Sequence, residues 1–166
     1  MPRVPIRKLR ESWRRGYERW VADYERYAKM RGFQSFNDGP YHRRGFIECW
    51  GEPGFHRFWQ VWNPGIAYFV YRVYIRLGGR RHWVVATLLS FLVCGFVHTI
   101  IVVPFFGRWS NSVIIAFGCF GMLTVLSRAL APVLRQERWP AIANILVNVG
   151  LVVGSFDLGF RVDDLL

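Results

Sequence analysis

The chain has 166 residues, of which 52% are hydrophobic, and it carries a formal net charge of +11. Basic residues crowd the first 81 positions, whereas the long uncharged apolar runs begin at His82. A soluble domain rarely combines such an apolar excess with so much positive charge, and an intrinsically disordered chain is far less apolar. The composition therefore excludes a soluble enzyme and indicates an integral membrane protein with a basic face.

Residues 6–31 predict an amphipathic helix, because large apolar residues recur every three or four positions. The stripe includes the aromatic residues Trp13, Tyr17, Trp20, Tyr24 and Tyr27, and the opposite face includes Arg14 and Arg15. Trp and Tyr suit a surface where one end of the side chain is apolar and the other is wet. Two interpretations stay equally open: the helix lies on a membrane surface with anionic head groups, or it packs on a partner protein.

Residues 32–57 predict a loop, because turn-forming Asn, Gly and Pro residues gather there. We therefore expect a basic helix and loop over residues 1–57, for membrane-surface or partner binding, and a membrane domain over residues 58–166. The loop histidines, His42 and His56, and the three cysteines lack a metal-ligand spacing. No metal site and no cofactor are expected.

An apolar and aromatic segment, FWQVWNPGIAYFVYRVYIRL, occupies residues 58–77. An Asn-Pro-Gly sequence at 63–65 interrupts it, and Arg72 and Arg76 charge its second half. An arginine at the centre of a bilayer costs about 3 kcal/mol on insertion scales. The segment is therefore predicted to be interfacial or re-entrant.

Three long apolar runs follow, at about residues 82–107, 109–134 and 139–160. Each is long enough to cross about 30 Å of hydrocarbon. Backbone groups in lipid must be hydrogen-bonded within the chain, which favours helices. The predicted fold is an all-α membrane protein with three transmembrane helices, or four if residues 58–77 also cross.

Basic residues flank one side of the predicted spans: Arg80 and Arg81 precede the first, and Arg135 and Arg138 separate the second from the third. The positive-inside rule places this side and the N-terminus on the cytoplasmic or matrix face. A bacterial inner membrane and an inner membrane of a mitochondrion or plastid both fit. Attraction to anionic lipid head groups accounts for the charge excess, so nucleic-acid binding is disfavoured.

His98 lies deep within the first predicted span. An ionisable residue inside a membrane is a functional hypothesis by default, and a neutral imidazole can accept a proton from a hydroxyl. The alternative is a histidine hydrogen-bonded to a neighbouring helix. In the third span, Asn144 and Asn148 favour contact with another helix over a lipid or pigment, and Asp157 favours an ion pair with Arg161.

The segment FWQVWNPGIAYFVYRVYIRLGG, followed by SFLVCGFVH, resembles the motif region of the membrane-bound O-acyltransferases. The matching residues are Phe58, Trp59, Trp62, Asn63, Leu77, Gly78, Gly79, Cys94, Gly95 and His98. The resemblance covers about residues 58–134. It implies that His98 is the general base towards an acceptor hydroxyl, that Asn63 is the second polar motif residue, and that the donor is an acyl thioester.

The sequence also departs from that family. Its members have many more spans around a tunnel, and three spans cannot alone build walls that hold two substrates and exclude water. Arg76 stands in place of the family's proline. We therefore expect a non-catalytic accessory subunit of a larger bioenergetic or photosynthetic membrane complex. The alternative is an O-acyltransferase that uses His98 and Asn63 and whose chamber is completed by a partner or a homo-oligomer.

Overall fold

The computed structural model describes residues 6–32, 43, 47–107 and 109–165, and the regular elements among them are all helical. In chain order these elements are α1 (Ile6–Met30), η1 (Glu48–Gly51), α3 (Phe55–Val61), α4 (Pro64–Arg76), α5 (Trp83–Phe106), α6 (Ser112–Leu134), η2 (Gln136–Arg138) and α7 (Ala141–Asp163). The predicted all-α fold, with a helix ahead of the membrane spans, is confirmed. Much of the predicted loop, including His42, lies outside the described residues.

The chain divides into two compact units, residues 1–41 and 42–166. The first unit contains α1, which ends at Met30 and is followed by a turn at Arg31 and Gly32. Gly32 has a φ of 79°, a left-handed conformation that glycine adopts without a steric penalty, and the helix ends there, at the predicted start of the loop. The division falls earlier in the chain than the boundary after residue 57, because η1 packs on α7 and belongs with the membrane helices.

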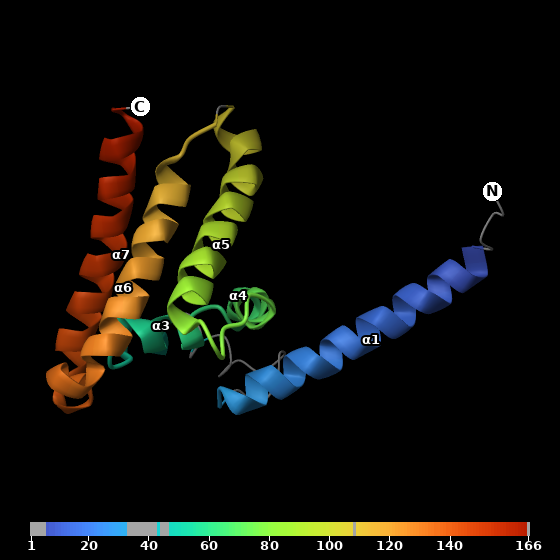
Figure 1. The fold of residues 1–166 in the computed structure, drawn as a ribbon, viewed down its shortest axis with the longest axis horizontal. Helices are drawn as coiled ribbons and strands as arrows, with labels where there is room; N and C mark the ends of the chain where they lie inside the picture. The colour runs from blue at the N-terminus through green and yellow to red at the C-terminus, as the bar shows by residue number, and fades with distance from the viewer. Residues whose placement is uncertain (1–5, 33–42, 44–46, 108, 166) are drawn as a thin grey trace. The chain divides into compact units, whose positions relative to one another are not determined.

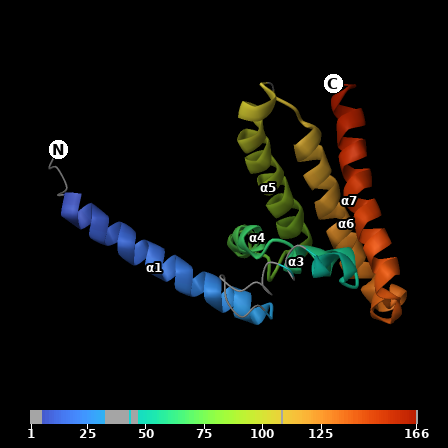
Figure 2. The same cartoon turned by 180° about the vertical axis from the view of Figure 1, so that it is seen from behind.

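Among the described residues, three helices are long and apolar enough to cross a membrane: α5, α6 and α7. They coincide with the three predicted spans to within a few residues, and the third continues to Asp163. Helix α6 lies between α5 and α7 and packs on both, so the three form a layer (Figures 1 and 2). Helices of 23 residues are about 35 Å long, enough to cross a hydrocarbon core of about 30 Å and to extend a little into the head-group region.

Glycines bring α5 and α6 close together. A Cβ atom on Gly95 of α5 would lie 2.7 Å from the Cβ of Phe117 on α6, and one on Gly121 of α6 would lie 3.4 Å from the Cα of Leu88 on α5. Lipid tails are as apolar as leucine, so helices in a bilayer associate chiefly through such close packing. Gly150 and Gly154 of α7, by contrast, meet nothing within 4 Å.

Helix α3 packs on α6 by way of an aromatic cluster. Phe55 and Phe58 are 1% exposed, and the Trp59 ring lies 5.3 Å from that of Phe91 on α5 and 4.9 Å from that of Phe120 on α6. The Phe120 ring in turn lies 5.5 Å from Phe156 of α7. The cluster thus joins α3 to all three spans, at the end of the layer where α5 begins and α6 ends (Figure 1).

Asn148 of α7 joins η1 to the layer. Its side-chain amide donates hydrogen bonds to the carbonyl oxygens of Trp50, at 2.8 Å, and Glu52, at 3.0 Å. Asn144, one turn earlier, donates to the carbonyl of Gln136 at 3.3 Å. The predicted contact with a neighbouring helix is made with the short 3₁₀ helices η1 and η2, and not with another span. The partners of both asparagines are short connecting segments, whose carbonyls are not all used within a helix.

We expect Gly95→Ala to destabilise the membrane domain by about 1–3 kcal/mol, because the added methyl group overlaps Phe117. Gly150→Ala is the matched control: its Cβ meets nothing within 4 Å, and alanine is the better helix former. Unfolding of both variants in detergent micelles measures the difference. Equal stabilities would contradict the close packing of α5 on α6.

Candidate functional site

His98 is half-buried in α5, and its ring is oriented by its own helix. Its Nδ1 lies 2.8 Å from the carbonyl oxygen of Cys94, one turn earlier, and the ring packs on Phe117 with centroids 4.8 Å apart. A carbonyl can only accept a hydrogen bond, so Nδ1 carries the proton and donates it. In the neutral ring Nε2 then keeps its lone pair, the state that a general base needs.

Asn63, the second polar residue of the resemblance, caps a helix. Its backbone is left-handed, with a φ of 40°, and its Oδ1 accepts a hydrogen bond from the N–H of Ile66 at 3.4 Å. Asparagine tolerates this conformation better than most residues and is a preferred N-cap. Pro64 follows as the first residue of α4, where its missing N–H costs nothing. The Asn-Pro pair therefore ends α3 and starts α4.

The glycines of the LGG turn close the other end of α4. The N–H of Gly78 donates to the carbonyl of Ile75, and the N–H of Gly79 donates to that of Tyr74 at 3.0 Å. With a φ of 73° at Gly78, this is the Schellman arrangement that commonly ends helices. A side chain at Gly79 would overlap the Tyr74 ring, whose hydroxyl donates to the Gly79 carbonyl at 2.6 Å.

The structure does not join His98 to Asn63 by a hydrogen bond. Each bonds within its own helix or cap. Two buried hydroxyls of α5 also bond their own helix: Ser90 donates to the carbonyl of Ala86, and Thr99 donates to that of Gly95. Groups of three or more His, Cys, Asp or Glu residues able to hold a metal ion are absent from the described part of the chain.

Asp157 and Arg161 pair as predicted, with Oδ2 and Nε 2.8 Å apart on the exposed side of α7. The same end of the layer is tied by Asp163, which accepts hydrogen bonds from the hydroxyl of Ser110 at 2.6 Å and from the N–H of Asn111 at 2.9 Å. A carboxylate there also faces the positive end of α6. Asp163 thereby ties the end of α7 to the start of α6, whereas the Asp157–Arg161 pair lies within α7.

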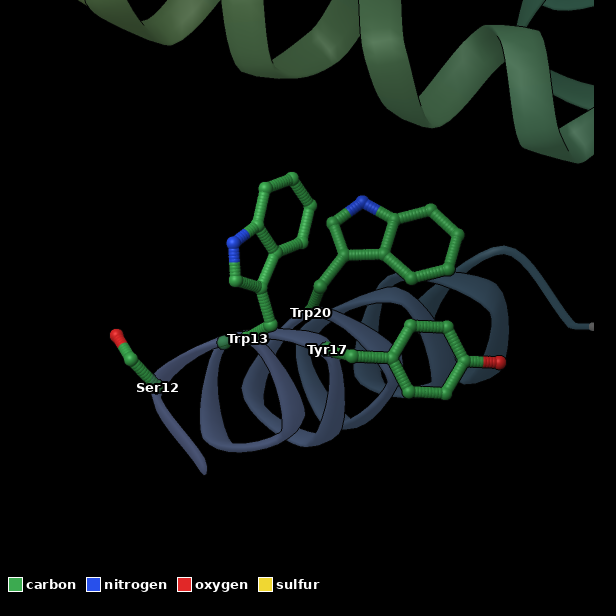
Figure 3. Close-up of a pocket in the computed structure, with 5 residues that line it drawn as sticks. Ser12, Trp13, Tyr17 and Trp20 are labelled. Carbon is green, nitrogen blue, oxygen red and sulfur yellow. The ribbon is translucent and has the colours of Figure 1, made fainter. Parts of the chain in front are cut away.

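The predicted binding residues of α1 divide into two groups. Trp13, Tyr17 and Trp20 are 79%, 66% and 47% exposed, whereas Tyr24 and Tyr27 are each 3% exposed. Burial and the neighbouring Tyr27 raise the pKa of Tyr24 to about 12. Arg14 and Arg15 are exposed. A shallow depression of about 410 Å³ on α1 is lined by Ser12, Trp13, Gly16, Tyr17 and Trp20. Figure 3 shows the side chains of Ser12, Trp13, Tyr17 and Trp20 on this helix.

The basic end of the membrane domain lies where α5 begins and α6 ends. Arg80 and Arg81 are exposed in the turn before α5. The Arg128 guanidinium of α6 lies 4.7 Å from the centre of the Trp83 ring, a cation–π contact between α6 and the start of α5. The sequence did not predict this contact, because residue spacing predicts contacts within a helix and not contacts between residues of two different helices.

His56 of α3 is a second contact that the sequence did not reveal. Its Nδ1 lies 3.1 Å from the hydroxyl of Ser127 on α6, and its backbone N–H donates to the same hydroxyl at 3.3 Å. Burial, together with the positive charges of Arg57 and Arg128, lowers the pKa of His56. The sequence prediction treated it as an ordinary loop histidine, but it holds α3 to α6.

We expect the membrane domain to lose stability on acidification. In the unfolded chain His56 has a pKa near 6.5, and in the folded protein its pKa is lower. Between these two pKa values the unfolded chain binds more protons than the folded protein, so the free energy of unfolding rises with pH. Neutral His56 stabilises the fold fully above about pH 6.5, and this stabilisation is lost as the pH falls towards the lowered pKa of His56. Unfolding in detergent as a function of pH measures it. His56→Gln should flatten the pH dependence, and an unchanged pH profile in that variant would contradict the assignment.

No family model, no curated protein and no solved structure matches the chain. The resemblance to membrane-bound O-acyltransferases therefore remains a prediction from the sequence motifs. The structure assigns the chain to integral membrane proteins with three apolar spanning helices.

Proposed function

We propose that the chain is a non-catalytic structural subunit of a larger membrane complex. One observation carries this proposal: the polar and glycine residues that the motif region shares with the acyltransferases serve the architecture of this chain. Asn63 and Gly78 cap the two ends of α4, and Gly95 lets α5 approach α6. A residue that is needed to form a helix end or a helix contact requires no catalytic role to explain it.

The uncovered surface of the spans supports the same proposal. Only 17% of the most apolar stretch of α7 is buried within the chain, against 33% for α5. Large side chains such as Leu146 and Val153, 66% and 61% exposed, lie on its outer face. Lipid tails or other subunits can cover such a face, and in a complex α7 would offer the larger surface to a neighbouring subunit.

The proposed orientation puts the basic end of the layer on the cytoplasmic or matrix side. Arg80 and Arg81 before α5, and Arg135 and Arg138 between α6 and α7, lie at that end. At the other end the tail carries Arg161 with Asp163 and Asp164. The positive-inside rule favours this arrangement in a bacterial inner membrane or an organelle inner membrane of the bioenergetic or photosynthetic kind.

Purification of the tagged chain in mild detergent, followed by mass spectrometry of co-migrating polypeptides, tests the proposal. We expect stoichiometric membrane subunits, and we expect His98→Phe to retain them, since the proposed role needs no base at that position. A stable monomer without partners would overturn the proposal. Loss of the partners in His98→Phe, with the chain still folded, would show that His98 has a role beyond packing.

A second function, O-acyl transfer, is favoured by one observation. The hydrogen bond from His98 Nδ1 to the Cys94 carbonyl leaves the Nε2 lone pair as the acceptor for a hydroxyl proton. In this alternative an acyl thioester is the donor, and a partner or a homo-oligomer supplies the remaining walls of the chamber.

His98→Ala tests the alternative by assaying acyl transfer in the purified assembly. General-base catalysis contributes about 10²–10⁴-fold, so the variant should lose at least that factor while the assembly stays intact. Asn63→Gly is a useful companion, because glycine keeps the left-handed turn and removes only the side chain. Acyl transfer by the wild-type assembly that persists unchanged in His98→Ala would exclude His98 as the base.

A further inference from the structure

The exposed aromatic face of α1 is not explained by a structural role in the membrane domain. Its residues Trp13, Tyr17 and Trp20 follow one another at helical spacing, and the Tyr17 and Trp20 rings stack with centroids 6.2 Å apart. Figure 3 shows the two indole rings projecting from the same side of the helix. The stripe continues to Tyr24, stacked on Trp20 at 5.7 Å, but there it becomes buried.

The change of exposure along this stripe divides α1 into two halves. The side chains of Trp13, Tyr17 and Trp20 are about half to four-fifths exposed, whereas Tyr24 and Tyr27 are almost fully buried. The second half of the stripe is therefore already covered. The first half leaves two indole rings and a phenol largely exposed around an open depression, a face that is able to take an occupant.

The positive charges in the N-terminal half of α1 indicate what kind of molecule covers its exposed aromatic side chains. Between Ile6 and Met30 the helix has eight basic residues and four acidic ones. Six of the basic residues precede Trp20: Arg7, Lys8, Arg10, Arg14, Arg15 and Arg19. A basic helix with a Trp- and Tyr-rich face and a low overall hydrophobicity has the composition of helices that lie in the interface of a bilayer. Anionic phospholipids complement its positive charge.

A protein partner fits these observations less well. The cores of protein interfaces are depleted of charged residues. The exposed half of α1 also carries Arg14, Arg15 and Arg19, which stand outside the aromatic stripe and are themselves exposed, so a partner that covered only the stripe would leave this positive charge unmatched. Arginine stems can lie along an apolar surface while the guanidinium groups remain at the level of phosphates, an arrangement that a lipid interface accepts. We propose that the N-terminal half of α1 is a membrane-surface anchor that binds anionic phospholipid through Trp13, Tyr17, Trp20 and the neighbouring arginines.

This anchor goes beyond the structural role proposed above and does not depend on it. An isolated chain without partner subunits could still bind lipid through α1. A subunit of a complex could equally lack a lipid-binding α1. The two proposals are therefore tested separately, and the failure of one does not decide the other.

The test uses two variants of the full chain, each carrying a single environment-sensitive fluorophore on a different side of α1. Gly16→Cys puts the label beside the depression, where a Cβ meets nothing within 4 Å. Ala22→Cys puts it on the opposite, exposed face and serves as the matched control. The native thiols, Cys49, Cys94 and Cys119, are buried, which directs labelling to the introduced cysteine. The labelled proteins are reconstituted in phosphatidylcholine nanodiscs with and without phosphatidylglycerol.

We expect the label at position 16 to shift its emission to the blue and to be quenched by nitroxide-bearing lipids in the discs that contain phosphatidylglycerol. Its quenching should be several-fold stronger than that of the label at position 22. Replacing both Trp13 and Trp20 by alanine, or both Arg14 and Arg15 by glutamate, should reduce the effect to the level of the control. These substitutions lie on an exposed helix and leave the membrane domain folded, which circular dichroism verifies.

Three results would overturn the proposal. Equal quenching at positions 16 and 22 would show that the aromatic face does not enter the bilayer. Equal quenching at position 16 in neutral and anionic discs would show that the arginines do not select lipid charge. A label at position 16 that is shielded only when a co-purified polypeptide is present would identify a protein as the occupant.

Discussion

Backbone polar groups inside a bilayer must find hydrogen-bond partners within the protein, and the membrane domain is organised around this requirement. The three spans meet it as uninterrupted helices. The short segments η1 and η2 cannot satisfy all their carbonyls internally, so Asn148 and Asn144 of α7 donate to them. Segment η1 packs on both α7 and α3, and α3 in turn packs on α6 through the aromatic cluster around Trp59.

The motif residues illustrate how a sequence resemblance and a structural requirement can coincide. Asn63 supplies a left-handed residue and a cap acceptor, and Gly78 supplies a left-handed residue at the opposite end of the same helix. Both are needed because α4 has 13 residues, too few to cross a bilayer, and has to start and stop between other helices. His98 differs from them, because its ring nitrogen Nε2 has no hydrogen-bond partner among the described residues. The side chain of His98 therefore keeps an acceptor that can bond a further group.

Charge is distributed in this molecule according to its surroundings. The arginines next to the spans, such as Arg80 and Arg135, lie at helix ends, where a guanidinium group can reach water or a phosphate. Arg128 lies further inside α6 and is covered on one side by the Trp83 ring. In α1, by contrast, exposed arginines occupy the face opposite an exposed aromatic stripe. The first pattern fits helices that cross a bilayer, and the second fits a helix that lies at its surface.

The amino-acid sequence by itself determined the fold class, the three spans and the amphipathic helix, because each depends on hydrophobic length or on a period that is written locally in the chain. It also predicted the ion pair of Asp157 with Arg161, since an i to i+4 contact requires only a helix. The tertiary structure alone decided which segments meet. Asn148 and Trp50 lie 98 positions apart, and His56 and Ser127 lie 71 apart, so no local pattern encodes either contact. The exposed and buried halves of the α1 stripe also repeat the same spacing in the sequence, and they differ only because folding covers one of them.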